Sequence, residues 1–333
     1  MRRKKMKDTD YLFLSAKLRA MENNLLTAGR MERMIDAPTA AEAARVLSEI
    51  GYGEFSPDSE SALSEALAAE REKTFEELRH FMPDHSVIDV FRVKYDYHNL
   101  KAVLKAQAMG LPCEGLLIDA GRVDPKALLE ALREGDYAGL PEELAAAAQE
   151  AAEVLGTTKD PQRSDFVLDR AYYREMLRCA EETGSAFLRR YVQMTIDAAN
   201  LRSAVRTLRM GKGGDFLRRV LVDGGTIPAE RVTAAALGSG LGELYRTTEL
   251  RAAAEYGTAA IQGGSLTDFE KACDDAVTRF VAKAKQVPFG VEVAIGYLAA
   301  KEIEFTAVRM IMSSRMAGID GEIIRERLRE SYV

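Results

Sequence analysis

The sequence predicts an all-α protein built from three similar helical units, and three observations support this prediction. Alanine, leucine, glutamate and arginine dominate a chain with 9 prolines and no tryptophan, a composition that suits long helices. The stretch 87–110 spaces its apolar residues three or four positions apart, as one stripe of a helix requires; these are Val90, Val93, Tyr97, Leu100 and Leu104. One such helical segment recurs three times, and no run shows the alternation of a half-buried strand.

The recurring segments align without a gap. They read DYHNLKAVLKAQAMG from Asp96, DAANLRSAVRTLRMG from Asp197 and EFTAVRMIMSSRMAG from Glu304. Each begins with an acid, continues to a cation five residues later and reaches a glycine nine residues after that. The cations are Lys101, Arg202 and Arg309, and the glycines are Gly110, Gly211 and Gly318. Glycine adopts the left-handed conformation cheaply, so each is expected to end a helix.

A turn into a new helix is predicted after the first two glycines. Pro125 and Pro228 fit the first helical position, where the fixed φ angle of proline is favourable. Asp119 and Asp223 precede them and are expected to bind free backbone N–H groups near the helix start. Each unit therefore contains short helices followed by a long helix that ends in glycine.

The repeat divides the chain into three domains and a final helix. The predicted domains are residues 1–110, 111–211 and 212–318, followed by a C-terminal helix at 319–333. Repeats longer than ~50 residues exceed the usual solenoid periods. We therefore expect the three units to close into a ring or funnel with pseudo-threefold symmetry, and the last helix to pack on the first repeat and close the circle.

Charge and hydropathy exclude several classes of protein. The net charge is -6 and the pI is near 5.4, which argues against a nucleic-acid-binding protein, because that function needs a concentrated basic face. No run approaches the ~18 apolar residues of a membrane span, and no apolar segment follows the basic residues 2–7 as a signal peptide would require. Residence on the cytoplasmic side is expected, and the basic run is interpreted as a solvated tail or a contact with anionic lipid.

Nucleotide binding and diphosphate chemistry are both disfavoured by the motifs. Lys212 lies in the glycine-rich stretch RMGKGGDFL, but Gly213 replaces the serine or threonine of a phosphate-binding loop and a helix precedes it. Asp274 and Asp275 resemble the start of a DDxxD motif, but Thr278 occupies the position of its last acid. We interpret these stretches as a helix-ending turn and as solvated helix charges, with no cofactor.

The histidines and cysteines predict neither a metal site nor a catalytic triad. The 3 histidines, all between residues 80 and 98, have no spacing suited to zinc, and a triad would have to draw its histidine from that one part of the chain. Cys113, Cys179 and Cys273 are odd in number and scattered, as reduced thiols are. No catalytic, cofactor-binding or metal-binding residue is predicted.

The repeated polar residues are the candidate contact residues. A separation of five places acid and cation about 140° apart on a helix, so each is expected to contact a neighbouring helix. They either brace the protein internally or contact a partner, and bracing is favoured because buried polar groups are usually paired within the protein. The candidates are Asp96, Asn99, Lys101, Asp197, Asn200, Arg202, Glu304 and Arg309.

Segments at both ends of the chain resemble a known family. The opening YLFLSAKLRAMENNLLTAGRMERMIDAPTAAEAARVL from Tyr11 and the late PFGVEVAIGYLAAKEIEFTAVRMIMSSRMAG from Pro288 resemble the C subunits of V/A-type ATP synthases, whose eukaryotic equivalents are the d subunits of V-ATPases. The resemblance extends over nearly the whole chain through the repeated helices. Ala307 departs from the pattern, because it stands where the other repeats have Asn99 and Asn200. Any polar contact shared by that position is therefore in doubt.

The resemblance implies a non-catalytic rotor adaptor. Members of the family are expected to be all-helical funnels of three domains, one copy per complex, that bind the central-stalk subunits and the proteolipid ring on the cytoplasmic face of the membrane. Such an adaptor would transmit torque for ion transport coupled to ATP synthesis or hydrolysis, and its membrane association would be indirect, through the ring. The alternatives are a helical scaffold of another assembly and a helical metal-dependent enzyme.

Overall fold

The computed structural model describes residues 6–333, and every regular element in that range is helical, which confirms the predicted all-α class. Most of the basic run at residues 2–7 lies outside the described part. The α-helices are α1 (Leu12–Met21), α2 (Ala28–Asp36), α3 (Ala40–Ser48), α4 (Glu60–Phe81), α5 (Ser86–Met109), α6 (Pro125–Glu134), α7 (Glu142–Thr158), α8 (Pro161–Glu182), α9 (Ala186–Arg209), α10 (Gly214–Val220), α11 (Ala229–Leu237), α12 (Leu241–Leu244), α13 (Arg251–Ile261), α14 (Leu266–Ala282), α15 (Val291–Met316) and α16 (Gly321–Arg327). Short 3-10 turns are η1 (Asp8–Tyr11), η2 (Glu22–Asn24), η3 (Glu114–Leu116) and η4 (Lys283–Gln286). None of the helices in residues 6–333 has the length and apolar character needed to cross a bilayer.

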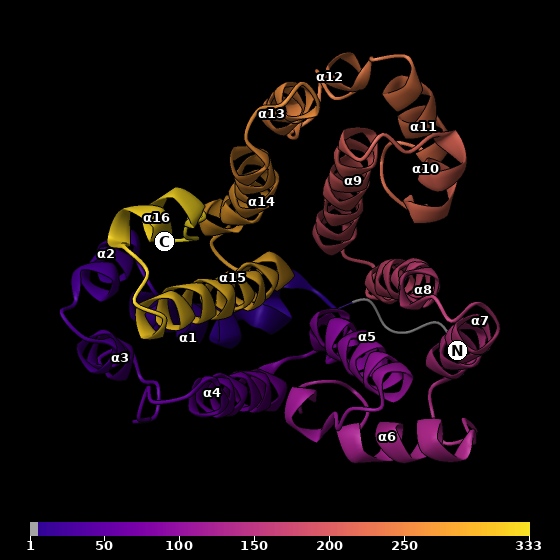
Figure 1. Cartoon of the computed structure of the whole chain (residues 1–333). Helices are drawn as coiled ribbons and strands as arrows, with labels where there is room; N and C mark the ends of the chain where they lie inside the picture. Colours follow the sequence, from indigo (N-terminus) through magenta and orange to yellow (C-terminus); the bar gives the residue numbers. More distant parts are fainter. Residues whose placement is uncertain (1–5) are drawn as a thin grey trace.

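The three recurring segments lie on the three longest helices, α5, α9 and α15, which we call the motif helices. Figure 1 shows that they meet near the middle of the molecule and diverge toward its edge. At the centre, the rings of Phe91 on α5 and Tyr191 on α9 stack with centroids 5.6 Å apart. The hydroxyl of Tyr95 on α5 donates to Glu302 on α15 at 2.7 Å. All three motif helices are therefore in contact through their inner parts.

The glycines of the repeat end the motif helices, as predicted. Gly110, Gly211 and Gly318 have φ angles of 65°, 68° and 69°, which is the left-handed conformation that residues with a Cβ adopt only with strain. The stretch around Lys212 is part of such a helix end, since the Lys212 N–H donates to the carbonyl of Thr207 at 3.0 Å.

The predicted helix starts are only partly correct. Pro125 is the first residue of α6, but the capping carboxylate is that of Asp124, which accepts from the Lys126 N–H at 2.7 Å. Pro228 precedes α11 as its N-cap residue, and that cap has no side-chain hydrogen bond. Neither Asp119 nor Asp223 caps these helices, because each lies five residues or more before the first helical residue, beyond the reach of a short side chain.

Each motif helix packs on different parts of the chain. Helix α5 lies against α6, α7 and α8, and α9 lies against α10, α11, α13 and α14. Helix α15 lies against α14 but also against α1 to α4, from the other end of the sequence. Its outer half forms an apolar core with α2, α3, α4 and α16, in which Phe305, Ile311 and Met312 contact residues such as Leu47 and Leu63. The start and the end of the described chain are thus packed together.

The last helix lies beside the second. Arg325 on α16 pairs with Glu32 and Asp36 on α2, and Ile324 belongs to the core shared with α2 and α3. The domain boundaries after residues 110, 211 and 318, and the ring or funnel they would form, stay a prediction.

Candidate functional site

Asp96 on the first motif helix binds the loop that leads into α6. One carboxylate oxygen accepts the backbone N–H groups of Arg122 at 2.8 Å and Val123 at 3.1 Å. The other accepts from Nε of Arg122 at 2.7 Å. One turn further along, the side-chain amide of Asn99 exchanges two hydrogen bonds with the backbone of Ile118, at 2.8 and 2.9 Å. The acid and the amide together hold one loop segment against α5.

The second motif helix repeats this arrangement with the loop before α11. Asp197 accepts the backbone N–H groups of Thr226 at 3.1 Å and Ile227 at 3.2 Å, and the Thr226 hydroxyl also donates to it. Asn200 exchanges two hydrogen bonds with the backbone of Val222, at 2.8 and 2.9 Å. The same side chains at the same spacing therefore bind the same part of the following loop.

The third motif helix binds a segment from the start of the chain. Glu304 accepts the backbone N–H of Leu26 at 2.8 Å, two residues before α2 begins. It also accepts from the hydroxyl of Tyr52 at 2.8 Å. Ala307 cannot form the paired amide contact of the other repeats. At the corresponding place the chain is still helical, at the end of α1.

Two glycines allow the close approach of the loop to the carboxylate. A Cβ atom at Gly121 would lie 2.2 Å from Oδ1 of Asp96, and one at Gly225 would lie 2.2 Å from Oδ1 of Asp197. Both distances are far below van der Waals contact. In the third unit Asn24 stands at the corresponding position, two residues before Leu26, and the acid is the longer Glu304. The side chain of Glu304 is longer than aspartate by one methylene group, and it binds the Leu26 N–H without a glycine at the position of Asn24.

The repeated cations connect each motif helix to the helix that precedes the next one. Lys101 on α5 pairs with Asp169 on α8, and Arg202 on α9 pairs with Asp274 on α14. Arg309 on α15 donates to the hydroxyl of Ser64 on α4, at 3.2 Å, and α4 precedes α5. These three contacts, which we call the cyclic braces, link α5 to α8, α9 to α14 and α15 back to α4. Asp274 is thus engaged by Arg202, and the DDxxD-like stretch forms part of a brace.

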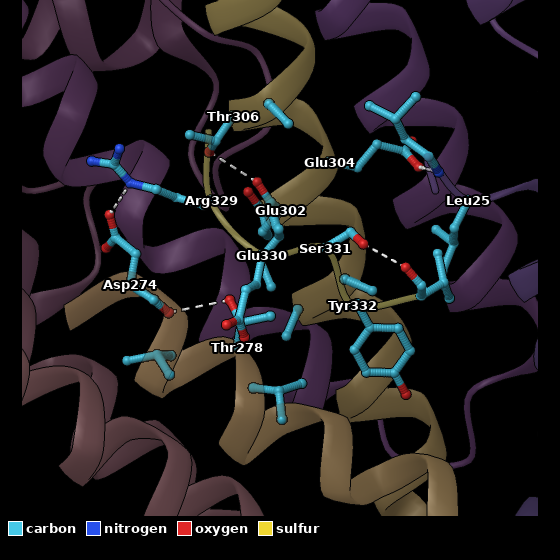
Figure 2. Close-up of a pocket in the computed structure, with 18 of the residues that line it drawn as sticks. Leu25, Asp274, Thr278, Glu302, Glu304, Thr306, Arg329, Glu330, Ser331 and Tyr332 are labelled. Carbon is cyan, nitrogen blue, oxygen red and sulfur yellow. Dashed lines mark hydrogen bonds and ion pairs between the residues drawn. The ribbon is translucent and has the colours of Figure 1, made fainter. Parts of the chain in front are cut away.

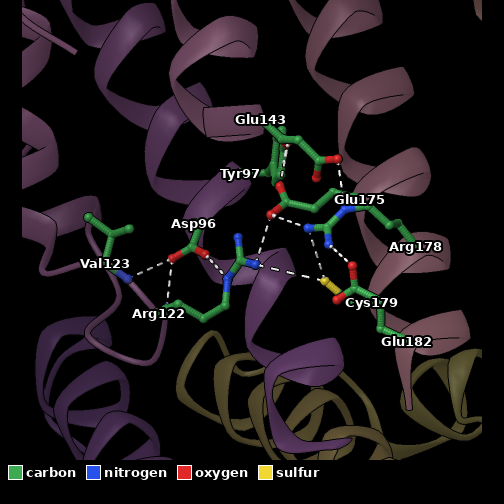
Figure 3. Close-up of polar contacts among 9 residues, drawn as sticks. All are labelled: Asp96, Tyr97, Arg122, Val123, Glu143, Glu175, Arg178, Cys179 and Glu182. Carbon is green, nitrogen blue, oxygen red and sulfur yellow. Dashed lines mark hydrogen bonds and ion pairs between the residues drawn. The ribbon is translucent and has the colours of Figure 1, made fainter. Parts of the chain in front are cut away.

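A buried charge network surrounds the first acid (Figure 3). Arg122 lies between two buried carboxylates, with its side chain 2.7 Å from Asp96 and 2.8 Å from Glu175. Glu175 also accepts from the hydroxyl of Tyr97 at 2.9 Å. Burial disfavours the charge of Arg122, but Glu175 and Asp96 outweigh it and raise the pKa of the guanidinium. Burial raises the pKa of Asp96, and Arg122 opposes this.

The other two motif acids, Glu304 and Asp197, differ in their charged neighbours. Nζ of Lys301 lies 2.6 Å from Glu304 and 3.0 Å from Glu70, so one cation again serves two buried carboxylates. Asp197 is 4% exposed, and its partners are the hydroxyl and N–H groups of the loop. Burial raises the pKa of Asp197, opposed mainly by the Thr226 hydroxyl. Of the three motif acids, Asp197 therefore has the least compensation for its charge.

A cavity of about 330 Å³ lies where the motif helices meet (Figure 2). Equivalent positions of the three repeats line it, namely Lys94, Thr195 and Glu302, each two residues before the motif acid. Lys94 pairs with Glu302 across the cavity. The remaining lining is largely apolar and includes residues of α9, α14 and α15.

No group of three or more histidine, cysteine or acidic residues in 6–333 is placed to bind a metal ion. The cysteines are buried and outside disulfides, and burial raises the pKa of Cys179 to about 11 and of Cys273 to about 12. Such thiols stay protonated near neutral pH and are poor nucleophiles. Burial also lowers the pKa of His98.

Comparison of the sequence with known proteins shows the family of the chain. Residues 14–327 match the ATP synthase (C/AC39) subunit family. The chain belongs to this family. The resemblance to the C subunits of V/A-type ATP synthases, expected from the two terminal segments, is thereby confirmed.

Relatives in the ATP synthase (C/AC39) subunit family match the chain over almost its full length. The C subunit of the V-type sodium ATPase of Enterococcus hirae is 25% identical over 329 residues, covering 97% of this chain and 99% of the relative. The C subunit of the V-type ATP synthase of Thermus thermophilus is 26% identical over 315 residues, covering 92% and 94%. The C subunit of the A-type ATP synthase of Thermococcus kodakarensis is 26% identical over 351 residues, covering 96% and 90%.

Sequence reasoning missed several residues of the polar network in this family member. Arg122, Glu175 and Glu70 had no local signal for their buried contacts, because Asp96, Arg122 and Lys301, with which they form them, lie on other elements. Lys301 could have been found, since a cation three residues before Glu304 is a favourable helical pair. The glycines could also have been found, because Gly121 and Gly225 each lie two residues after an aspartate in the aligned loops, DAG and DGG.

We predict that Gly225→Ala destabilises the protein by about 2 to 3 kcal/mol, because the new methyl group must displace the Asp197 carboxylate and overpack a buried site. Gly139→Ala is the matched control, since a Cβ there meets no atom within 4 Å and its φ is not in the left-handed region. Urea unfolding of both variants measures the difference. Equal midpoints would show that the loop does not lie against the carboxylate.

We predict that Asp197→Asn changes how stability depends on pH. The folded-state pKa of Asp197 is raised above its ordinary value of 3.8, so the carboxyl favours folding most when it is protonated. That contribution is complete below the unfolded pKa and is lost as the pH rises through the folded pKa. The variant lacks this titration. The stability of the wild type relative to the variant should therefore fall between about pH 4 and neutral pH, and a constant difference in chemical denaturation would contradict it.

Proposed function

We propose that this chain is the non-catalytic rotor adaptor of a V/A-type rotary ATP synthase. In this proposal one copy per complex links the central-stalk subunits to the proteolipid ring on the cytoplasmic face of the membrane. It transmits torque for ion transport coupled to ATP synthesis or hydrolysis, it needs no cofactor, and it contacts the membrane through the ring. Family membership over residues 14–327 supports the assignment to such a complex.

The cyclic braces are the observation that carries the mechanical part of the proposal. A part that transmits torque must resist shear between its two faces. Each motif helix is tied to a neighbour by its cation, and the third tie, from Arg309 to Ser64, joins the two ends of the chain. A cycle of ties has no unsupported edge, so load applied to one unit is shared by all three. The candidate residues at the acid, amide and cation positions would then brace the adaptor internally.

The third brace is the weakest on physical grounds. Ser64 stands 105 residues before Asp169, which stands 105 before Asp274, so a hydroxyl replaces the carboxylate of the other braces. Burial lowers the pKa of Arg309, and the nearby Arg71 lowers it further. A neutral acceptor stabilises a guanidinium less than a carboxylate does. The seam between the chain ends is therefore held mainly by Glu304 and the apolar core of α15.

Co-purification tests the adaptor role. The chain is mixed with central-stalk subunits and detergent-solubilised proteolipid ring, and the products are scored by size-exclusion elution and subunit stoichiometry. We expect one copy per stalk–ring complex, and separate stalk and ring when the chain is omitted. A chain that ignores both partners would contradict the proposal and favour a helical scaffold of another assembly.

Removing two braces tests the mechanical argument. In the assembled complex, the double variant Lys101→Ala, Arg202→Ala is expected to retain stoichiometric assembly, because each half-exposed ion pair contributes at most about 1 kcal/mol. Its ratio of ions transported to ATP hydrolysed should fall, since the body between the two partners is less stiff. The matched control is Arg246→Ala, Arg251→Ala, which removes two exposed pairs within α12 and α13 and their flanks. An unchanged ratio in the brace variant would exclude a role of the braces in coupling.

A further inference from the structure

The last six residues, Leu328–Val333, leave α16 without regular structure and run beside the central cavity. Figure 2 shows Glu330, Ser331 and Tyr332 passing between the ribbons of neighbouring helices. Arg329–Val333 all line the central cavity, and a second cavity of about 560 Å³ is lined by Leu328 to Ser331. The segment therefore borders empty space at two places along its length, unlike a segment of the core.

The segment makes several polar contacts, and at its two ends Leu328 and Val333 pack, partly buried, against the apolar cores. Arg329 pairs with Asp274 on α14 at 2.9 Å, where Asp274 also forms the brace with Arg202. The Glu330 N–H donates to Asp275 at 2.8 Å, and the Glu330 carboxylate pairs with Arg279. Half-exposed ion pairs are screened by water and salt. The two ion pairs therefore hold the segment weakly, whereas the bond to Asp275, which is 4% exposed, is shielded from water.

One side chain anchors the segment. Tyr332 is 4% exposed and lies against Gly296 on α15. A Cβ at Gly296 would be 2.8 Å from the tyrosine hydroxyl oxygen and 2.7 Å from the Cβ of Ala284. Gly296 thus leaves a notch in α15 that the ring end fills. The hydroxyl donates to Glu22 at 3.3 Å, and Lys285 donates to the carbonyl of Tyr332 at 3.3 Å.

We propose that residues 328–333 form a releasable strap that closes the central cavity in the free subunit, with Tyr332 seated in the Gly296 notch as its latch. On release of the latch, the cavity walls of α9, α14 and α15 become accessible. The proposal rests on the proposed function in one respect, namely that the central-stalk subunits replace the strap when they bind. A segment that has no regular structure, in which Tyr332 is the one buried residue and the others are partly exposed, opens locally without unfolding the rest.

Hydrogen exchange of the whole chain tests the strap. In the wild type, we expect the amides of residues 328–333 to exchange faster than those of α9 and α15. Tyr332→Ala removes the latch, so it should accelerate exchange in 328–333 by at least about tenfold and leave α9 and α15 as in the wild type. Gly296→Ala fills the notch and should accelerate exchange in 328–333 as well, together with a local change in α15 where the new Cβ meets Ala284. Tyr256→Ala, at a tyrosine 50% exposed on α13, is the matched control and should change nothing in the segment.

The same experiment with central-stalk subunits added tests the replacement. Binding should accelerate exchange in 328–333 of the wild type, and Tyr332→Ala should associate with the stalk faster. The proposal is overturned if the segment is as protected as α15, if it stays protected in the complex, or if Tyr332→Ala loosens α14 and α15 as much as the segment. Failure of the wild type to bind the stalk would refute the proposed function, whereas exchange in the isolated chain would still decide whether the strap exists.

Discussion

The burial of a carboxylate in each motif helix is the constraint on which the remaining structure depends. Asp96, Asp197 and Glu304 are at most 4% exposed, and an ionised group removed from water is strongly unfavourable unless it is hydrogen-bonded. In every case the backbone N–H groups of a segment just before a short helix meet this need. The motif helix thereby fixes where that segment and its helix lie.

The same need is met differently in the third unit, because its loop partner is supplied by the beginning of the chain. The contact between Leu26 and Glu304 joins residues 278 apart in sequence. The carboxylate on α15 therefore obtains its backbone donor only when the start and the end of the chain pack together. The third unit has glutamate and Asn24 in place of aspartate and glycine, and the contact is kept. The third repeat thus keeps the contact between the acid and the backbone, although the residues that form it differ.

The charges around the three acids show how one architecture tolerates different chemistry. Arg122 reaches Asp96 from the loop, Lys301 reaches Glu304 from the same helix, and Asp197 is bound by neutral donors. Each cation that is present also pairs with a second buried carboxylate, Glu175 or Glu70. Buried charge pairs of this kind contribute to a defined geometry as much as to stability. A defined geometry at the centre is what the proposed adaptor role requires.

The sequence by itself determined the all-α class, the three equivalent helices, their glycine ends and the family, because helical periodicity, glycine conformation and repeated spacing are properties of neighbouring residues. Which residues contact one another across the fold was decided by the tertiary structure alone. The expected capping by Asp119 and Asp223 was wrong, since both lie too far before the helix along the chain, and Asp124, next to Pro125, caps α6. The pairing of Arg309 with Ser64, of Glu304 with Leu26 and of Tyr332 with Gly296 joins residues more than 30 positions apart. Such contacts depend on how separate helices pack in space, which no local pattern encodes.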